Sequence, residues 1–293
     1  MEPLPTLPLA QWEPTKDTLH LWVQIVGKVK MASLPPKNHW WHVPLYVDVR
    51  GLTTRLLHSA DGTGFEIRFD FVDHELVVET ASSNRSIELV DGLSVADFDA
   101  RLHGALGELD VTILEQPFGI PAFMTPFPDD REHATYDAEA VTRFWRVLDW
   151  SGGVLDEFSG WYCGKQSPVH LFWHGLDLAV TRFSGRPASP MPDADPVSRE
   201  AYTHEVISFG FWPETRPCAS RRTTRTHCPS RPGCATGRWR RRRRSGPIRA
   251  PARSPGSRTR SCGRRPTRAS CSSSSWRAPT RRAPTRPAGT AWG

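Results

Sequence analysis

The sequence predicts an α+β protein, in which an antiparallel β-meander packs with two or three helices and a disordered Arg/Pro/Ser-rich tail follows. Three observations lead to this fold class. Strand patterns with short turns occupy residues 42–90, segments with helical spacing lie before and after them, and strands and helices do not alternate regularly. The composition then changes at residue 216, so we expect an acidic globular α+β domain over 1–215 and a basic tail over 216–293.

The first element is a helix over about residues 16–31. Thr15 or Asp17 supplies a capping side chain, and two consecutive prolines at 35 and 36 end the helix. Its apolar stripe comprises Leu19, Trp22, Val23 and Val26. One side of this helix should therefore pack against the core.

The β-meander is expected between residues 42 and 90. Phe65, Ile67, Phe69 and Phe71 alternate with charged residues, which is typical of a half-buried strand. Turn-forming residues recur at positions 50–51, 61–64, 73–74 and 82–84. Their close spacing predicts roughly five antiparallel strands.

Two further helices follow the meander. Ser94 and Asp97 form a capping-box pattern at the start of one helix. Asp137 begins a second long helix, which the glycine pair at 152–153 should break or kink. Between the two helices we expect a strand over 111–114 and an irregular, proline-rich loop over 117–130.

The last part of the domain contains two aromatic-rich segments, 169–183 and 204–212, which the sequence predicts to be strands. A proline-rich connector over 187–196 joins them. Because these strands follow helices without a regular crossover pattern, they also favour the α+β class.

Charge is divided unevenly along the chain. Residues 216–293 contain 22 of the 38 basic residues and none of the 31 acidic ones, which leaves a net charge of −15 on the first 215 residues. An acidic body repels nucleic acid and anionic membranes, so neither is expected as its partner. The absence of a long apolar run predicts no membrane span, and the single cysteine of the body, Cys163, fits a reducing cytoplasm.

Three interpretations of the Arg-rich tail stay open. It is a genuine basic arm that binds nucleic acid, a metal module built on its five cysteines, or an out-of-frame product of a GC-rich gene. Composition favours the frameshift, because GC-rich codons in the wrong frame yield the Arg, Pro, Ala, Gly, Ser and Thr that dominate the tail. In that case the domain is truncated and lacks its natural C-terminal portion, and the tail should be disordered.

The common phosphate-binding, nucleophile and zinc motifs are absent from the sequence. The remaining candidates for a functional site are histidines that lie beside aromatic and acidic residues. The catalytic candidates are His170, His174 and Asp177, and the ligand-binding candidates are His39, His42, Trp40, Trp173, Arg182 and His204. Neither a cofactor nor a metal ion is specified by these residues.

The spacing of His170 and His174 distinguishes two kinds of site. In a helix the two side chains lie about 6 Å apart and share one metal ion. In a strand they lie about 13 Å apart, which is too far for a single ion. The surrounding aromatics favour a strand, so we expect the two histidines to flank a pocket rather than to bind one metal together.

Each candidate also has a purely structural interpretation. Histidines among aromatics are commonly hydrogen-bonded residues of the core or its rim, and Arg182 is a simple partner for Asp177. The charged residues at 70–75 fit a tight turn. Cys163 fits a buried, inert thiol better than a reactive one activated by Lys165.

Four long phrases carry a resemblance to a known family. They are Trp12-Glu-Pro-Thr-Lys-Asp-Thr-Leu-His-Leu-Trp22, Asn38-His-Trp-Trp-His-Val-Pro-Leu-Tyr46, Ser167-Pro-Val-His-Leu-Phe-Trp-His174 and Ser198-Arg-Glu-Ala-Tyr-Thr-His-Glu-Val-Ile-Ser-Phe-Gly-Phe-Trp212. They resemble the uncharacterised bacterial family catalogued as domain of unknown function number 5996, over about residues 8–213. The resemblance implies a bacterial, cytoplasmic protein and assigns no activity, and it ends where the composition changes.

Three functions therefore remain open. The favoured one is a cytoplasmic bacterial enzyme or small-molecule-binding protein with a pocket lined by His and Trp. The second is a structural or protein-interaction domain without catalysis. The third is nucleic-acid binding, which requires that the Arg-rich tail is genuine. The oligomeric state is not indicated by the sequence.

Overall fold

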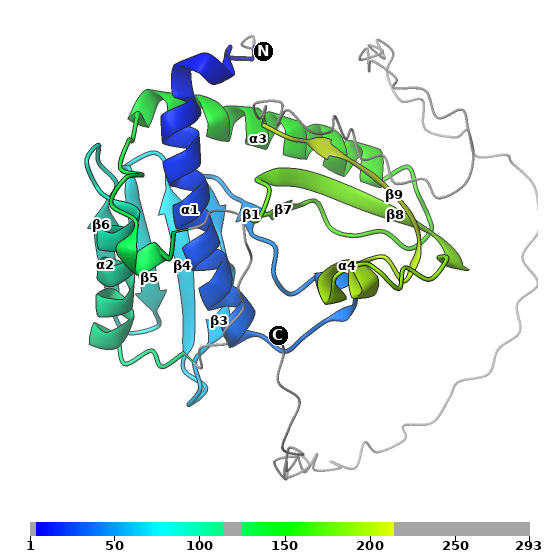
Figure 1. Ribbon diagram of the computed structural model, residues 1–293, viewed down its shortest axis with the longest axis horizontal. Helices are drawn as coiled ribbons and strands as arrows, with labels where there is room; N and C mark the ends of the chain where they lie inside the picture. Colours follow the sequence, from blue (N-terminus) through cyan, green and yellow to red (C-terminus); the bar gives the residue numbers. More distant parts are fainter. Residues whose placement is uncertain (1–3, 114–124, 214–293) are drawn as a thin grey trace, which may run out of the picture. The chain divides into compact units, whose positions relative to one another are not determined.

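The computed structural model describes residues 4–113 and 125–213 (Figure 1). The helices are α1 (Leu9–Ser33), α2 (Val95–Glu108), α3 (Ala138–Ser159) and α4 (Pro196–Ala201), with short 3-10 helices η1 (Asn38–Trp40) and η2 (Phe127–Asp129). The strands are β1 (Tyr46–Val47), β2 (Gly51–Thr53), β3 (Leu57–His58), β4 (Gly64–Asp70), β5 (Glu75–Thr80), β6 (Asn84–Glu88), β7 (His170–Phe172), β8 (Asp177–Pro187) and β9 (His204–Phe211). The α+β class is confirmed.

The predicted meander forms a six-stranded antiparallel sheet, in which β1, β2, β4, β5 and β6 are neighbours in that order and β3 pairs with β4. Ile67 of β4 lies opposite Val78 of β5, and both are fully buried. Helices α1 and α2 lie against this sheet (Figure 1). Trp22 of α1 stacks on Phe98 of α2 with 5.0 Å between ring centroids, and Phe98 stacks on Phe69 of β4 at 6.1 Å.

A second, three-stranded sheet has the order β7-β8-β9, and α3 packs against it (Figure 1). The aromatic ring of Phe144 on α3 contacts Phe211 of β9 at 6.5 Å and Trp12 of α1 at 5.1 Å. An antiparallel bridge between Leu45 and Leu171 joins the two sheets. Helix α1 therefore contacts elements of both halves of the domain and lies between them.

Helix α1 begins earlier than the sequence predicted. It starts at Leu9, after an extended Pro8, and contains Pro14, so the expected cap at Thr15 or Asp17 is wrong. Thr15 instead accepts a hydrogen bond from the backbone N–H of Asp137 at 3.0 Å. Burial of Trp12 against the ring of Phe144 explains why the early turns are retained despite the proline.

The expected break in the second long helix is also wrong, because α3 continues through Gly152 and Gly153 to Ser159. A glycine in a helix costs about 1 kcal/mol relative to alanine, which packing readily offsets. At Gly152 a Cβ atom would lie 3.9 Å from the side chain of Leu178, so the helix and strand β8 approach closely at this point.

Several local predictions are confirmed and two are wrong. The side chains of Ser94 and Asp137 cap α2 and α3. Residues 111–113 form no strand in the described part of the chain, and Thr112 accepts a single backbone hydrogen bond from Ala60. Helix α4 follows the connector and was not predicted. The predictions for residue 114, for 117–124 and for the tail at 216–293 lie outside the described residues.

Candidate functional site

A tight hairpin between β7 and β8 carries two of the predicted catalytic residues. Phe172 lies opposite Asp177 in the antiparallel register, so residues 173–176 form the turn and His174 lies within it. The strand prediction is therefore confirmed for His170, whereas His174 lies beyond the end of β7. A Cβ atom at Gly175 would lie 2.8 Å from Oδ1 of Asp177, so glycine leaves the space that this carboxylate occupies.

The hairpin is fixed against helix α1 by Trp173, which is 2% exposed. Its indole Nε1 donates a hydrogen bond to the carbonyl oxygen of Val43 at 3.0 Å. A Cβ atom at Gly27 of α1 would lie 2.4 Å from this indole, so Gly27 creates the space that the ring fills. Trp173 therefore packs in the core and positions the turn, and it does not line an open pocket.

This contact places the turn beside His20 of α1. The Nε2 atom of His20 lies 3.1 Å from the carbonyl oxygen of His174 and 3.1 Å from the side-chain nitrogen of Gln24. One imidazole nitrogen cannot donate to the carbonyl and accept from the amide at the same time, so the tautomer of His20 selects between the two bonds. We refer to His20, His174 and Asp177 together as the hairpin cleft, because the contact of His20 with the backbone of His174 brings α1 against this turn.

The electrostatics of the hairpin cleft are governed by burial. Burial raises the pKa of the Asp177 carboxyl to about 6 and lowers the pKa of His20 to about 4. It also lowers the pKa of His174, although this side chain is exposed to solvent.

The arrangement combines one carboxylate with two neutral imidazoles at neutral pH. Asp177 forms no ion pair with any other residue that the structure describes, so no cation offsets the effect of burial on the pKa of its carboxyl, and only a hydrogen bond with its own backbone N–H lowers that pKa. The predicted partner, Arg182, donates instead to the carbonyl oxygen of Phe158 at 2.7 Å and lies over the Phe158 ring. Arg182 thus has a structural role between α3 and β8.

The third catalytic candidate, His170, is not part of the hairpin cleft. It is fully buried, and its ring lies 4.7 Å from that of Phe172 and 6.2 Å from that of Tyr46. Neither ring nitrogen has a hydrogen-bond partner among the described residues. Burial, with Lys30 and Arg55 nearby, lowers the pKa of His170 to about 3, so the imidazole is neutral.

The ligand-binding candidates near η1 divide between two environments. His39 lies 5.7 Å from His204 between ring centroids, and its Nε2 accepts a hydrogen bond from Lys165 Nζ at 3.0 Å. His42 stacks on Trp40 at 5.3 Å, and its Nδ1 accepts from a backbone N–H. Burial lowers the pKa of both histidines, His42 to about 4. All four candidates are therefore engaged in packing or hydrogen bonds.

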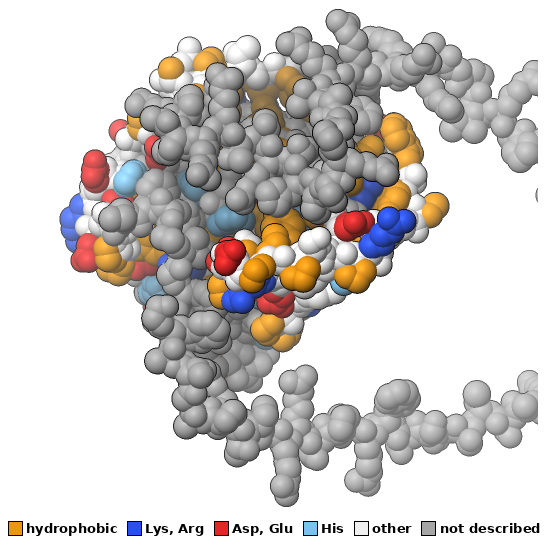
Figure 2. All heavy atoms as spheres, turned by 45° about the vertical axis from the view of Figure 1, so that its right-hand side comes forward, with side chains coloured by type: hydrophobic (Ala, Val, Ile, Leu, Met, Phe, Trp, Pro, Cys, Tyr) orange, Lys and Arg blue, Asp and Glu red, His pale blue; other side chains and the backbone are white. Residues whose placement is uncertain are grey.

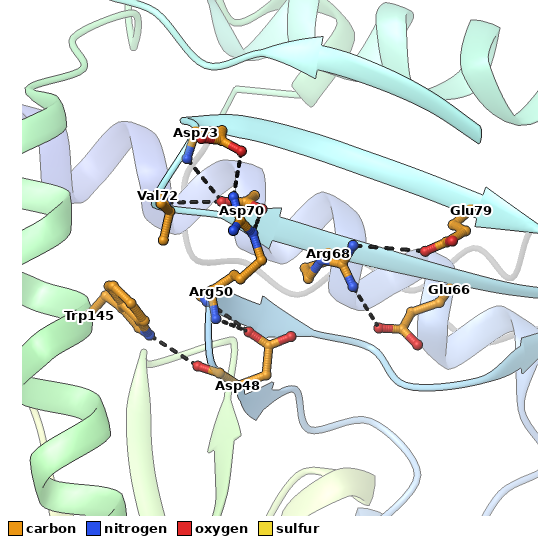
Figure 3. A network of polar contacts seen from close by, with 10 residues as sticks. Asp48, Arg50, Glu66, Arg68, Asp70, Val72, Asp73, Glu79 and Trp145 are labelled. Carbon is orange, nitrogen blue, oxygen red and sulfur yellow. Dashed lines mark hydrogen bonds and ion pairs between the residues drawn. The ribbon is translucent and has the colours of Figure 1, made fainter.

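The charged residues at 70–75 form the tight turn that their pattern indicated (Figure 3). The carboxylate of Asp70 accepts hydrogen bonds from the backbone N–H groups of Val72 and Asp73 at 3.0 Å each. Arg50 forms ion pairs with Asp70 and Asp73 and ties this turn to β2. The group is a structural anchor.

Cys163 is exposed, so the prediction of a buried thiol is wrong. The described ranges hold no group of three His, Cys, Asp or Glu side chains placed to bind a metal ion. Figure 2 shows hydrophobic side chains among acidic, basic and histidine side chains on the face that it draws. None of the helices described is long and apolar enough to cross a membrane.

Sequence reasoning missed His20, Lys30 and Arg55. His20 and Lys30 lie within the predicted first helix, where polar residues are normally solvated, so nothing marked them. The available signal was the phrase from Trp12 to Trp22, in which a histidine interrupts an otherwise buried helix face.

The protein is an α+β domain in which the hairpin between β7 and β8 carries a desolvated carboxylate, Asp177, and a neutral histidine, His174, while a second neutral histidine, His20, contacts the turn of the same hairpin. The chain belongs to the family of unknown function DUF5996, whose model matches residues 4–222. This match includes the whole described domain and ends within the first residues of the Arg-rich segment. No curated protein and no solved structure matches the chain.

Proposed function

We propose that this protein is an enzyme that binds a small molecule in the hairpin cleft and transfers a proton to or from it. Asp177 is the general base, and the imidazole of His174 orients the substrate by hydrogen bonding. The observation that carries the proposal is the position of Asp177: its carboxyl is half-buried at the base of the hairpin, without a cationic partner among the described residues.

The protonation states support this assignment. A general base works best when its pKa lies close to the working pH, and burial raises the pKa of Asp177 to about 6. Above this pH the carboxylate is ionised and accepts a proton. His20 and His174 are then neutral, because burial lowers the pKa of each imidazole. Activity should therefore rise as the pH increases through about 6.

The test is a screen of small molecules by thermal shift, with wild-type protein and Asp177→Asn in parallel. A substrate or analogue should raise the melting temperature of the wild type, and Asp177→Asn should bind it yet fail to turn it over. Asp195→Asn is a matched control, since Asp195 caps the short α4. Turnover that survives Asp177→Asn would contradict the role of Asp177, and the absence of any ligand-induced rise in the melting temperature would favour a structural or interaction role.

The cellular location of the protein and the origin of its Arg-rich tail are inferred from other observations. We infer a cytoplasmic location in a bacterium from the family resemblance and from the single body cysteine, Cys163, which is exposed and free. For residues 216–293 we infer an out-of-frame origin from composition. Translation of the nucleotide sequence around codons 213–217 in the two other frames should give a globular composition, and an Arg-rich product in all frames would contradict it.

A further inference from the structure

Three side chains surround the aromatic ring of Tyr46 near the C-terminal end of α1. We call Lys30, Tyr46, Arg55 and His170 the Tyr46 cluster. The Lys30 ammonium lies 4.8 Å and the Arg55 guanidinium carbon 3.4 Å from the centroid of the Tyr46 ring. The ring of His170 lies 6.2 Å from the same centroid. Three nitrogen-bearing side chains therefore gather at one tyrosine.

No acidic residue of the described chain neutralises this cluster. Neither Lys30 nor Arg55 forms an ion pair with a described carboxylate. Burial is the largest cause that lowers the pKa of Lys30, to about 7, and the positive charges of Arg55 and Lys37 add to it. Lys30 and Arg55 likewise contribute to the lowered pKa of His170. The local field is positive, although the body as a whole carries a net charge of −15.

The hydrogen-bonding capacity of the cluster is also unfilled. Lys30 Nζ donates to the carbonyl oxygens of Pro44 and Thr54 at 2.6 and 2.7 Å, which leaves one of its three donors free. His170 is fully buried, and both of its ring nitrogens lack a partner among the described residues. Buried polar groups without partners are rare and call for a bound water or ligand.

Access to the cluster is provided by Arg55. Its side chain is exposed, and its backbone has a φ of 58°, a left-handed conformation that only a few per cent of non-glycine residues adopt. The backbone N–H of Arg55 donates to Thr53 Oγ1 at 2.7 Å, which holds this conformation between β2 and β3. The guanidinium of this exposed residue lies over the Tyr46 ring.

We propose that the Tyr46 cluster binds an oxyanion group, either the phosphate or the carboxylate of a small molecule. Arg55 supplies paired N–H donors, which suit both oxyanions, and Lys30 of α1 supplies a second positive charge beside the same ring. The bound anion neutralises the two cations and gives an acceptor to the buried polar groups. This site is separate from the hairpin cleft, and neither proposal depends on the other.

The test measures binding of sodium phosphate and of sodium acetate to the full chain by thermal shift and calorimetry, with sodium chloride at matched ionic strength as the reference. Wild-type protein should bind phosphate or acetate above this reference. Arg55→Gln should weaken that binding by about tenfold or more, because it removes the charge-assisted donors. Arg101→Gln, which removes an exposed arginine of α2, should leave binding unchanged.

The binding results distinguish a phosphate ligand from a carboxylate ligand and show whether the anion binds at the Tyr46 cluster. Binding of phosphate alone identifies a phosphate ligand, and binding of acetate alone identifies a carboxylate. Equal affinity of wild type and Arg55→Gln, or no binding of either anion, would overturn the proposal. A change of the His170 ring ¹⁵N shifts on addition of the bound anion, absent in Arg55→Gln, places the anion at this cluster. An ordered water alone would leave those shifts unchanged.

Discussion

Asp177→Asn should stabilise the protein at neutral pH and not at acid pH. The folded carboxyl has a pKa of about 6, against 3.8 for an unperturbed aspartate. Below pH 3.8 both folded and unfolded chains hold the proton, so the group has no effect on stability. Between these values the folded chain alone keeps its proton, and above pH 6 folding bears the full cost of burying the charge.

The size of this cost follows from the shift in pKa. A shift of about two units corresponds to about 3 kcal/mol, and the partial exposure of the side chain makes this an upper limit. Asparagine has the same shape and no charge, so Asp177→Asn should raise the free energy of unfolding by about 1–3 kcal/mol at pH 7.5. At pH 4 the wild type and the variant should be nearly equally stable.

The assay is urea unfolding of both proteins at pH 4 and at pH 7.5. Asp195→Asn is the control, because the pKa of Asp195 lies below the ordinary value owing to its hydrogen bonds with Ser198, which outweigh the effect of burial. That variant should not gain stability at either pH. A stability difference between wild type and Asp177→Asn that is the same at both pH values would refute the reasoning.

Three further predictions concern packing and local structure. Gly27→Ala should lower the free energy of unfolding by about 1–3 kcal/mol, because the new Cβ atom meets the Trp173 indole. Gly107→Ala is the control, because its Cβ atom meets nothing within 4 Å, and it should not lower the stability. Urea unfolding compares the two variants, and an equal loss of stability in both would contradict the packing of Trp173 against Gly27. Ser94→Ala should cost about 1 kcal/mol through loss of the α2 cap, and an unchanged midpoint would show that the cap is dispensable. Trp173→Phe removes the hydrogen bond to Val43 and leaves part of the space beside Gly27 empty, so it should lower both the stability of the protein and ligand binding in the hairpin cleft. Intact ligand binding would contradict the positioning role of Trp173.

The sequence predicted the meander and the caps of α2 and α3 because these depend on local patterns. The alternation around Phe69 and the spacing of Ser94 and Asp97 identify strand and helix directly. The start of α1 at Leu9 was missed because it depends on Trp12 packing against Phe144, far along the chain. Tertiary packing here outweighs the local signal of Pro14.

The candidate sites also combine residues that are close in sequence with residues that only the fold brings together. His174 and Asp177 share one hairpin, so their spacing in sequence was sufficient to associate them. Their neighbour His20 lies 154 residues from His174, and the fit of Trp173 into the space at Gly27 brings the two elements together. The Tyr46 cluster likewise draws residues from α1, β1, a loop and β7, which sequence spacing does not reveal.

The pKa of the Asp177 carboxyl tests the central claim most directly. A pH titration followed by the ¹³C shift of this carboxyl, with Asp177→Asn to assign the signal, measures it without any knowledge of the substrate. The arrangement of the hairpin cleft predicts a midpoint near 6. A midpoint near the ordinary value of 3.8 would mean that solvent reaches the carboxylate freely, and would contradict its role as the general base.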